Sequence, residues 1–122
     1  MENFNKRLTT SVTAVKGCLI VNLPKYITDY DVKIGSRSIL MKANNSYIRG
    51  TILDFSMVSI LESHSFKACE EVSQAISLMG VQVIWIGIRP GIVSALMDLD
   101  LDVTGVKTAV NLEHAIKMIS NF

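Results

Sequence analysis

Residues 81–88, VQVIWIGI, form an almost continuous apolar run, and this run limits the fold more than any other stretch of the chain. A strand with one face in water alternates polar and apolar residues, whereas a strand covered on both faces need not. The run has the length of a strand and falls far short of the roughly 20 residues that a membrane-spanning helix requires. It therefore predicts a strand near the centre of a sheet with helices packed against it.

The segments on either side of this run have the periodicity of helices. Apolar residues recur every three or four positions before it, which predicts an amphipathic helix that begins near Ser63 and ends at Gly80. Pro90 occupies a position favoured for the first residue of a helix, so a short helix should follow. The apolar positions are Phe66, Cys69, Val72, Ile76 and Met79 in the first helix and Ile92, Val93, Leu96 and Met97 in the second.

The first part of the chain predicts a hairpin followed by a helix. Residues 12–15 and 18–23 are short runs rich in strand-forming residues, and the Lys-Gly pair between them suits a turn. Thr28 and Asp31 have the spacing of a capping box, which predicts a helix over residues 29–45. Its apolar face is expected to comprise Val32, Ile39, Ala43 and Tyr47.

Two further strands and a last helix complete the pattern. Strands are predicted at residues 51–58 and 106–110, and Asn111 is a favourable N-cap for a final helix. The order of elements is then β-β-α-β-α-β-α-β-α, an α/β fold with a mixed sheet and helices packed against it. A chain of 122 residues has the size of one domain, so we expect a single domain over residues 1–122 with its core at about 10–120.

The composition excludes several classes of partner. Twelve basic residues against eleven acidic ones leave a net charge of +1, which gives no electrostatic attraction for nucleic acid or an anionic membrane. No leader-like segment is evident, and the chain is expected to be cytoplasmic. The charged share of residues is 19%, below the usual quarter, and the mean hydropathy is +0.36. Either the additional apolar residues are buried in the strands, or they form an apolar surface for self-association or for a partner protein.

The sequence predicts neither a metal nor a cofactor. Cys18 and Cys69 form no CxxC pair and are expected to be buried, and His64 and His114 lack spaced ligand companions. The aspartates of MDLDLDVTG imitate the start of a calcium loop. That loop requires glycine at its sixth position and glutamate at its twelfth, where this chain has Val103 and Ala109.

The segment SILESHSF, residues 59–66, places polar residues where a strand passes into a helix. In α/β folds this edge of the sheet commonly carries functional groups. Ser63 is the residue of interest, although a serine at this point can also serve simply as an N-cap. No G-x-S-x-G motif, histidine–acid pair or glycine-rich phosphate loop accompanies it, so the chain is not expected to be an enzyme.

Several of these features together resemble a known family. The chain is similar to STAS domains, and among them to the S-type scaffold proteins of the bacterial stressosome. The similarity lies in the strand TILDFSMV, in the Glu62-Ser63 pair at a helix start and in the segment LMGVQVIWIGIRPGIVSALMDLDLDVTGVKTAVNLEHAI. The resemblance spans about residues 10–120. Its most specific part is the GIRP string at residues 87–90, followed by an apolar helix.

This resemblance implies a regulator without catalysis of its own. Members of this group are related to anti-sigma-factor antagonists and co-assemble with larger R-type STAS proteins into a homo-oligomer or a large hetero-assembly. The assembly holds a switch serine/threonine kinase, which phosphorylates the STAS domains under stress and is then released to control a sigma-factor type of stress response. No cofactor, nucleic acid or membrane is implied.

The family's phosphoacceptor falls on Ser63. Ser65 is a competing acceptor, and Ser94 lies near the position of a second acceptor in R-type relatives. The chain departs from the family pattern in having Glu62 for the usual aspartate and in its His64-Ser65 pair. The kinase-interaction loop implied by the resemblance comprises Leu61, Glu62, Ser63 and His64.

Two alternatives remain open at this point. The chain can be an anti-sigma-factor antagonist of the simpler kind, a small unit that binds an anti-sigma kinase directly. It can also bind a small ligand or a nucleotide at the same edge of the sheet, or be an unrecognised hydrolase.

Overall fold

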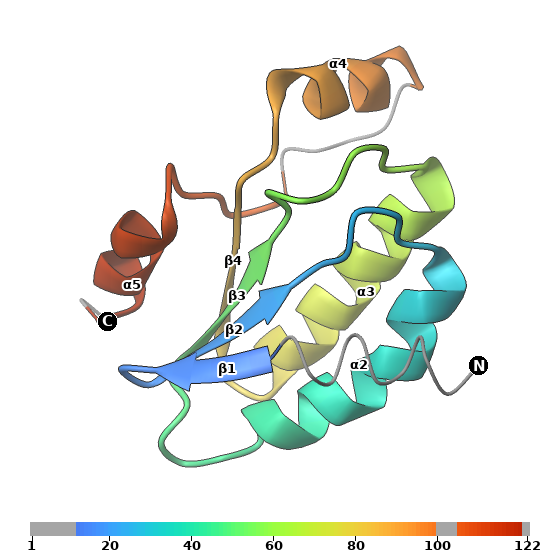
Figure 1. The fold of residues 1–122 in the computed structure, drawn as a ribbon. Coiled ribbons are helices and arrows are strands. Elements are labelled where there is room, and N and C mark those ends of the chain that lie inside the picture. Colours follow the sequence, from blue (N-terminus) through green and yellow to red (C-terminus); the bar gives the residue numbers. More distant parts are fainter. Residues whose placement is uncertain (1–11, 100–104, 121–122) are drawn as a thin grey trace.

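The computed structural model describes residues 12–99 and 105–120 and contains a four-stranded mixed sheet (Figure 1). Strands β1 (Val12–Val15) and β2 (Cys18–Asn22) pair antiparallel, as a two-residue turn requires. Strands β3 (Gly50–Asp54) and β4 (Gln82–Ile86) continue the sheet in parallel, in the order β1-β2-β3-β4. The mixed sheet with packed helices is therefore confirmed.

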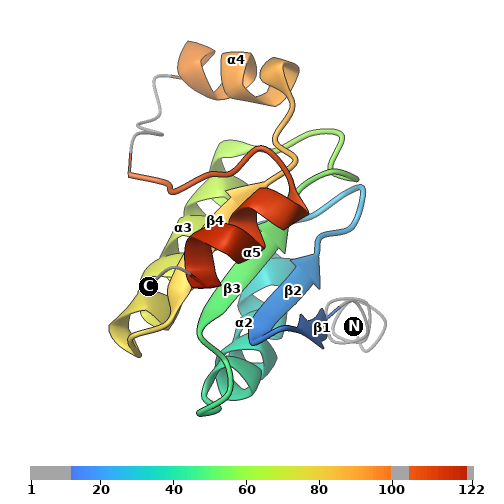
Figure 2. The same ribbon diagram turned by 90° about the vertical axis from the view of Figure 1, so that its left-hand side faces the viewer.

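The helices cover the sheet from both faces, and one of them stands apart. Helices α2 (Asp29–Ala43) and α3 (Ser63–Leu78) lie side by side on one face, and α5 (Leu112–Ser120) lies on the other (Figures 1 and 2). The short helix α4 (Pro90–Asp98) lies beyond the carboxyl ends of the strands. Among the described residues, no helix is long and apolar enough to cross a membrane.

Alternation along the strands creates two hydrophobic cores. Odd-numbered strand residues such as Leu53 and Trp85 face α2 and α3, while even-numbered ones such as Ile52 and Ile84 face α5. Trp85 is nearly fully buried and packs against Phe55, with ring centroids 4.7 Å apart, and edge-on against Phe66 at 5.6 Å. This aromatic cluster lies under the carboxyl end of the sheet, where it supports the segments described below.

The helix predicted after the hairpin is confirmed together with its cap. The Thr28 side chain accepts a hydrogen bond from the backbone N–H of Asp31, and the Asp31 carboxylate accepts one from the N–H of Thr28, both at 3.1 Å. The helix ends at Ala43, two residues earlier than predicted. Tyr47, which was expected on its apolar face, is 82% exposed because the chain has already turned away.

Two strand predictions were wrong in extent. The strand predicted at 51–58 ends at Asp54, because the N–H of Val58 bonds back to the carbonyl of Phe55 at 3.0 Å and the chain turns there. The strand predicted at 106–110 is present only as a bridge between Thr108 and Trp85. Backbone bonds from Trp85 to Lys107 and from Ala109 to Trp85 form this bridge, and β4 is the last full strand of the described sheet.

Candidate functional site

The connection between β3 and α3 lies at the carboxyl edge of the sheet and begins with a tight polar turn. The Asp54 carboxylate accepts hydrogen bonds from both the backbone N–H and the hydroxyl of Ser56, the first at 2.9 Å. Gly87, directly after β4, packs against this turn.

 A Cβ at Gly87 would lie 2.8 Å from the backbone nitrogen of Ser56, and the φ of Gly87 is +75°, so a side chain is excluded on both grounds. The turn and the end of β4 therefore fit closely together.

Two backbone contacts and one from a side chain fix the rest of this connection. The N–H of Ser59 donates to the carbonyl of Lys25 at 3.0 Å, and Ile60 forms a parallel bridge with Tyr26. The guanidinium of Arg89 donates to the carbonyl of Val58 from the other side. Because the segment is tied to neighbours on both sides, it presents α3 from a defined position.

Ser63 is the first residue of α3, and the N-cap is Glu62. The structure therefore does not support the simple interpretation of Ser63 as a helix cap. The Glu62 side chain makes no capping hydrogen bond, and no acidic residue lies in the first turn of α3. The N–H groups at the start of this helix consequently have no side-chain acceptor, and the positive end of the helix dipole is not neutralised by the first turn.

The side chains around Ser63 differ sharply in exposure. Glu62 and His64 are exposed and Ser63 is half-buried, whereas Leu61 is buried in the core. The Ser63 hydroxyl makes no hydrogen bond to the described residues. Ser65 is 2% exposed, and its hydroxyl donates to the carbonyl of Ile27 at 3.0 Å. The structure thus brings the four predicted loop residues together and directs Ser65 away from solvent.

Ser94 lies on a different element, in the middle of α4, and is exposed. A groove of about 480 Å³ separates α4 from the connection, with Ile60 and Leu61 on one side and Gly91 and Ala95 on the other. Ser94 does not line this groove. The two predicted acceptors Ser63 and Ser94 are therefore carried by neighbouring elements without sharing a cavity.

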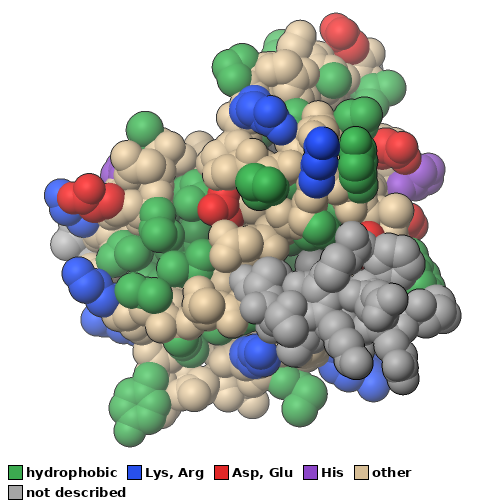
Figure 3. Space-filling model, in the orientation of Figure 1, with side chains coloured by type: hydrophobic (Ala, Val, Ile, Leu, Met, Phe, Trp, Pro, Cys, Tyr) green, Lys and Arg blue, Asp and Glu red, His purple; other side chains and the backbone are tan. Residues whose placement is uncertain are grey.

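Exposed apolar side chains accompany these polar groups. Met57 and Ile60 on the connection and Met97 on α4 are each more than 60% exposed, at 64%, 63% and 64%. Hydrophobic side chains gather around α4 at the upper end of the molecule (Figure 3). Part of the apolar excess in the composition is thus at the surface, next to the candidate site.

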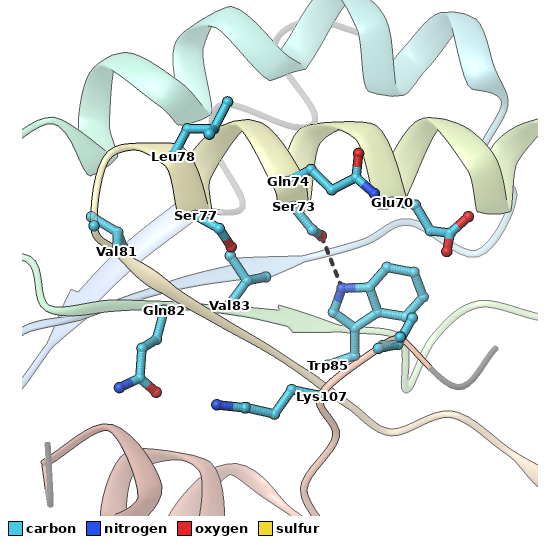
Figure 4. Close-up of a pocket in the computed structure, with 13 residues that line it drawn as sticks. Glu70, Ser73, Gln74, Ser77, Leu78, Val81, Gln82, Val83, Trp85 and Lys107 are labelled. Carbon is cyan, nitrogen blue, oxygen red and sulfur yellow. Dashed lines mark hydrogen bonds between the residues drawn. The ribbon is translucent and has the colours of Figure 1, made fainter.

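A second hollow, of about 740 Å³, lies beside the middle and end of α3 (Figure 4). Within it the indole N–H of Trp85 donates to the Ser73 hydroxyl at 3.0 Å, and that hydroxyl donates to the carbonyl of Cys69 at 2.7 Å. Burial raises the pKa of the Cys69 thiol to about 12, with a smaller contribution from the charge of Glu70, so this thiol is not a nucleophile at neutral pH. Among the described residues, no three His, Cys, Asp or Glu side chains gather to hold a metal.

Sequence reasoning missed the contacts that organise the site. We did not predict the hydrogen bonds of Asp54 with Ser56 or the close approach of Gly87 to Ser56. The hydrogen bond from Arg89 to the carbonyl of Val58 was not predicted either. An Asp-x-Ser turn directly after a strand is a local signal that could have been found. The contact of Arg89 joins residues far apart in sequence and has no such signal.

Comparisons with known proteins agree on the architecture. A variant of the RsbS protein of Moorella thermoacetica superposes with a TM-score of 0.75 at 22% identity, covering 90% of this chain and 93% of that one. A putative anti-sigma-factor antagonist from Thermotoga maritima gives 0.72 at 17% identity, covering 89% and 92%. An anti-sigma-factor antagonist (STAS) domain protein from Planctomyces limnophilus gives 0.71 at 13% identity, covering 89% and 96%. The chain has the STAS-domain fold.

The STAS fold also occurs inside larger proteins. In the murine anion transporter of the solute carrier 26 family, member A9, the matching region covers only 19% of that chain, with a TM-score of 0.69 at 20% identity. No family model matches the sequence, and no curated protein matches it. At these sequence identities, structural similarity to STAS domains establishes the fold and does not establish the function.

Proposed function

We propose that this chain is a STAS-type scaffold and regulator of a bacterial stressosome, switched by phosphorylation of Ser63. The observation that carries the proposal is the position of Ser63, a hydroxyl without a hydrogen-bond partner among the described residues, at a helix start with no side-chain cap. The fold is shared with RsbS and with a stressosome component, whose structure matches with a TM-score of 0.75 at 23% identity.

Ser63 is favoured over the other two candidate acceptors. Transfer of a phosphoryl group to Ser65 would require its buried hydroxyl to leave the Ile27 carbonyl and the helix to move. Ser94 is exposed but lies in the interior of α4, away from a helix N-terminus. A kinase can reach Ser63 without local unfolding.

The charge of a phosphate on Ser63 should affect the contact with a kinase more than the fold of the domain. Phosphorylation adds a charge of about −1.5 to −2 and three strong acceptors. The N–H groups of the first turn of α3 can donate hydrogen bonds to these oxygens, so the domain should stay folded. Glu62 beside it is already negative, and the combined charge changes the surface that a bound kinase would contact. The modified surface loses its complementarity to that partner.

Partners of the proposed scaffold are an R-type stressosome STAS protein and a switch serine/threonine kinase. The exposed Met57, Ile60 and Met97 offer apolar contact area next to Ser63. The Glu62, His64 and Ser65 departures from the family pattern are expected to tune which kinase recognises the loop. Ser63 is therefore both the proposed acceptor and the centre of the proposed kinase contact.

Phosphosite mapping by mass spectrometry tests this function. The chain is incubated with the switch kinase from the same source and Mg-ATP, with and without the R-type partner. We expect one phosphate on Ser63, lost in Ser63→Ala and kept in the matched control Ser94→Ala. If Ser63→Ala were modified to the same extent as the wild type, the assignment would be wrong.

A simpler antagonist is the second candidate. The unphosphorylated anti-sigma factor antagonist SpoIIAA matches over 91% of this chain and 97% of its own, with a TM-score of 0.67 at 12% identity. Such a protein would bind an anti-sigma kinase as a small unit. Light scattering after mixing with an R-type protein separates the two functions, because only a scaffold forms a large assembly.

A further inference from the structure

A cleft of about 780 Å³ lies between α4 and the segment that follows it in the described chain, residues 105–111. In Figure 2 this segment passes below α4, on the side of α5. Val93 and Leu96 line the cleft from α4, and Val106 and Thr108 line it from the opposite segment. Its inner end reaches the aromatic cluster of the core.

The size of this space distinguishes it from a packing defect. Protein interiors are close-packed, and most of their voids are no larger than a water molecule. Pockets that hold small molecules measure about 300–1,000 Å³. The cleft falls within that range, and its walls come from separate parts of the fold: α3 through Phe66, the end of β4, α4, the segment at 106–110, and α5 through His114.

The chemistry of the lining defines the kind of ligand. None of the described residues that line the cleft is Asp, Glu, Lys or Arg, and most are aliphatic or aromatic. The polar side chains are those of Thr108 and His114. The His114 Nδ1 accepts the backbone N–H of Val110 at 3.2 Å, so in the neutral imidazole the proton is on Nε2 and that atom is a donor. An apolar molecule with an acceptor oxygen suits such a lining, whereas an ion would find no counter-charge among the described lining residues.

We propose that this cleft binds a small, neutral, largely apolar molecule that carries a hydrogen-bond acceptor. Binding does not require phosphorylation, kinase or assembly, so the proposal is independent of the function argued above. The cleft is also distinct from the groove beside Ser63, which is lined by Ile60, Leu61 and the opposite part of α4. A bound molecule would contact both α4 and the first turns of α3, through Phe66.

The test uses the full chain alone with 6-propionyl-2-(dimethylamino)naphthalene, a neutral fluorescent ketone whose emission shifts to the blue in apolar surroundings. Two substitutions fill the cleft from opposite walls, Val93→Phe on α4 and Thr108→Phe on the facing segment. Val15→Phe is the matched control, since Val15 is 41% exposed on β1 and does not line the cleft. Thermal unfolding of each variant identifies those that remain folded.

We expect saturable binding of one probe per chain with a blue shift. Affinity should fall at least tenfold in each folded cleft-filling variant and stay at the wild-type value in Val15→Phe. Absence of saturable binding, or equal binding by all four proteins, would overturn the proposal. The second outcome would assign the probe to the exposed apolar surface. Phosphosite mapping has no bearing on either result, so failure here and failure of the proposed function are distinguishable.

Discussion

At the scale of single residues, Ser63 and Ser65 are two hydroxyls within one helical turn that have opposite surroundings. The Ser65 hydroxyl is buried and bonded to the carbonyl of Ile27, which connects α3 to the segment before α2. Ser63 is half-buried and has no such bond. Both residues are serines and they lie two positions apart, so their difference in burial decides their roles. Ser65 has a structural role, and Ser63 remains available for modification.

The two serines should therefore respond differently to substitution. Ser65→Ala leaves the Ile27 carbonyl unpaired in the core and should lower the free energy of unfolding by about 1–2 kcal/mol. Ser63→Ala removes no hydrogen bond and should change it by less than about 0.5 kcal/mol. Urea denaturation of both variants beside the wild type measures the difference. Equal losses of stability would contradict the assignment of Ser65 as the structural hydroxyl.

At the scale of elements, α5 is held on the sheet by a close approach. A Cβ on Gly50 of β3 would lie 2.5–2.8 Å from three side-chain atoms of Ile119, so the absence of a side chain lets the helix reach the strand. Ala115 and Ile119 are the buried residues of α5 and pack with the even-numbered strand residues. The packing of this helix depends on a glycine that belongs to another element.

Gly50→Ala should displace α5 and lower the free energy of unfolding by about 1–3 kcal/mol, the usual cost of overpacking. Gly91→Ala is the matched control, because a Cβ there meets nothing within 4 Å and the residue lies in α4. The control should be neutral or slightly stabilising. Thermal and urea unfolding of both variants measures the effect. An unchanged Gly50→Ala variant would show that Ile119 moves aside without loss.

Local sequence patterns predicted most elements because their causes are local. The capping box of Thr28 and Asp31, the helix that begins at Ser63 and the proline at the start of α4 all follow from neighbours in the chain. The strand at 106–110 was overestimated, because strand extent depends on pairing with β4 and only Thr108 forms the bridge. The candidate serine was predicted, whereas its support from Arg89 is a tertiary contact without a local pattern.

At the scale of the whole molecule, the described chain combines a well-buried body with one helix, α4, that buries little of its surface. Strands β2 and β3 lie in the middle of the sheet and are almost entirely buried. Helix α4 buries only Ile92 and Leu96 of its nine residues. Its neighbours are a groove on one side and the apolar cleft on the other. A motion of α4 would therefore change both cavities while the sheet keeps its core.

This difference in packing predicts that α4 opens without unfolding of the sheet. Native-state hydrogen exchange should give the amides of Leu96 and Met97 an opening free energy about 2 kcal/mol or more below those of Ile52 and Leu53 in β3. Helix α5 is the internal control, because it has the same length but packs against β3 and β4, so its later amides should be better protected. If the α4 amides opened only with the β3 amides, α4 would be an integral part of the cooperative core. The cleft would then have a fixed shape, and entry of a ligand would need global unfolding or an opening already present at its surface.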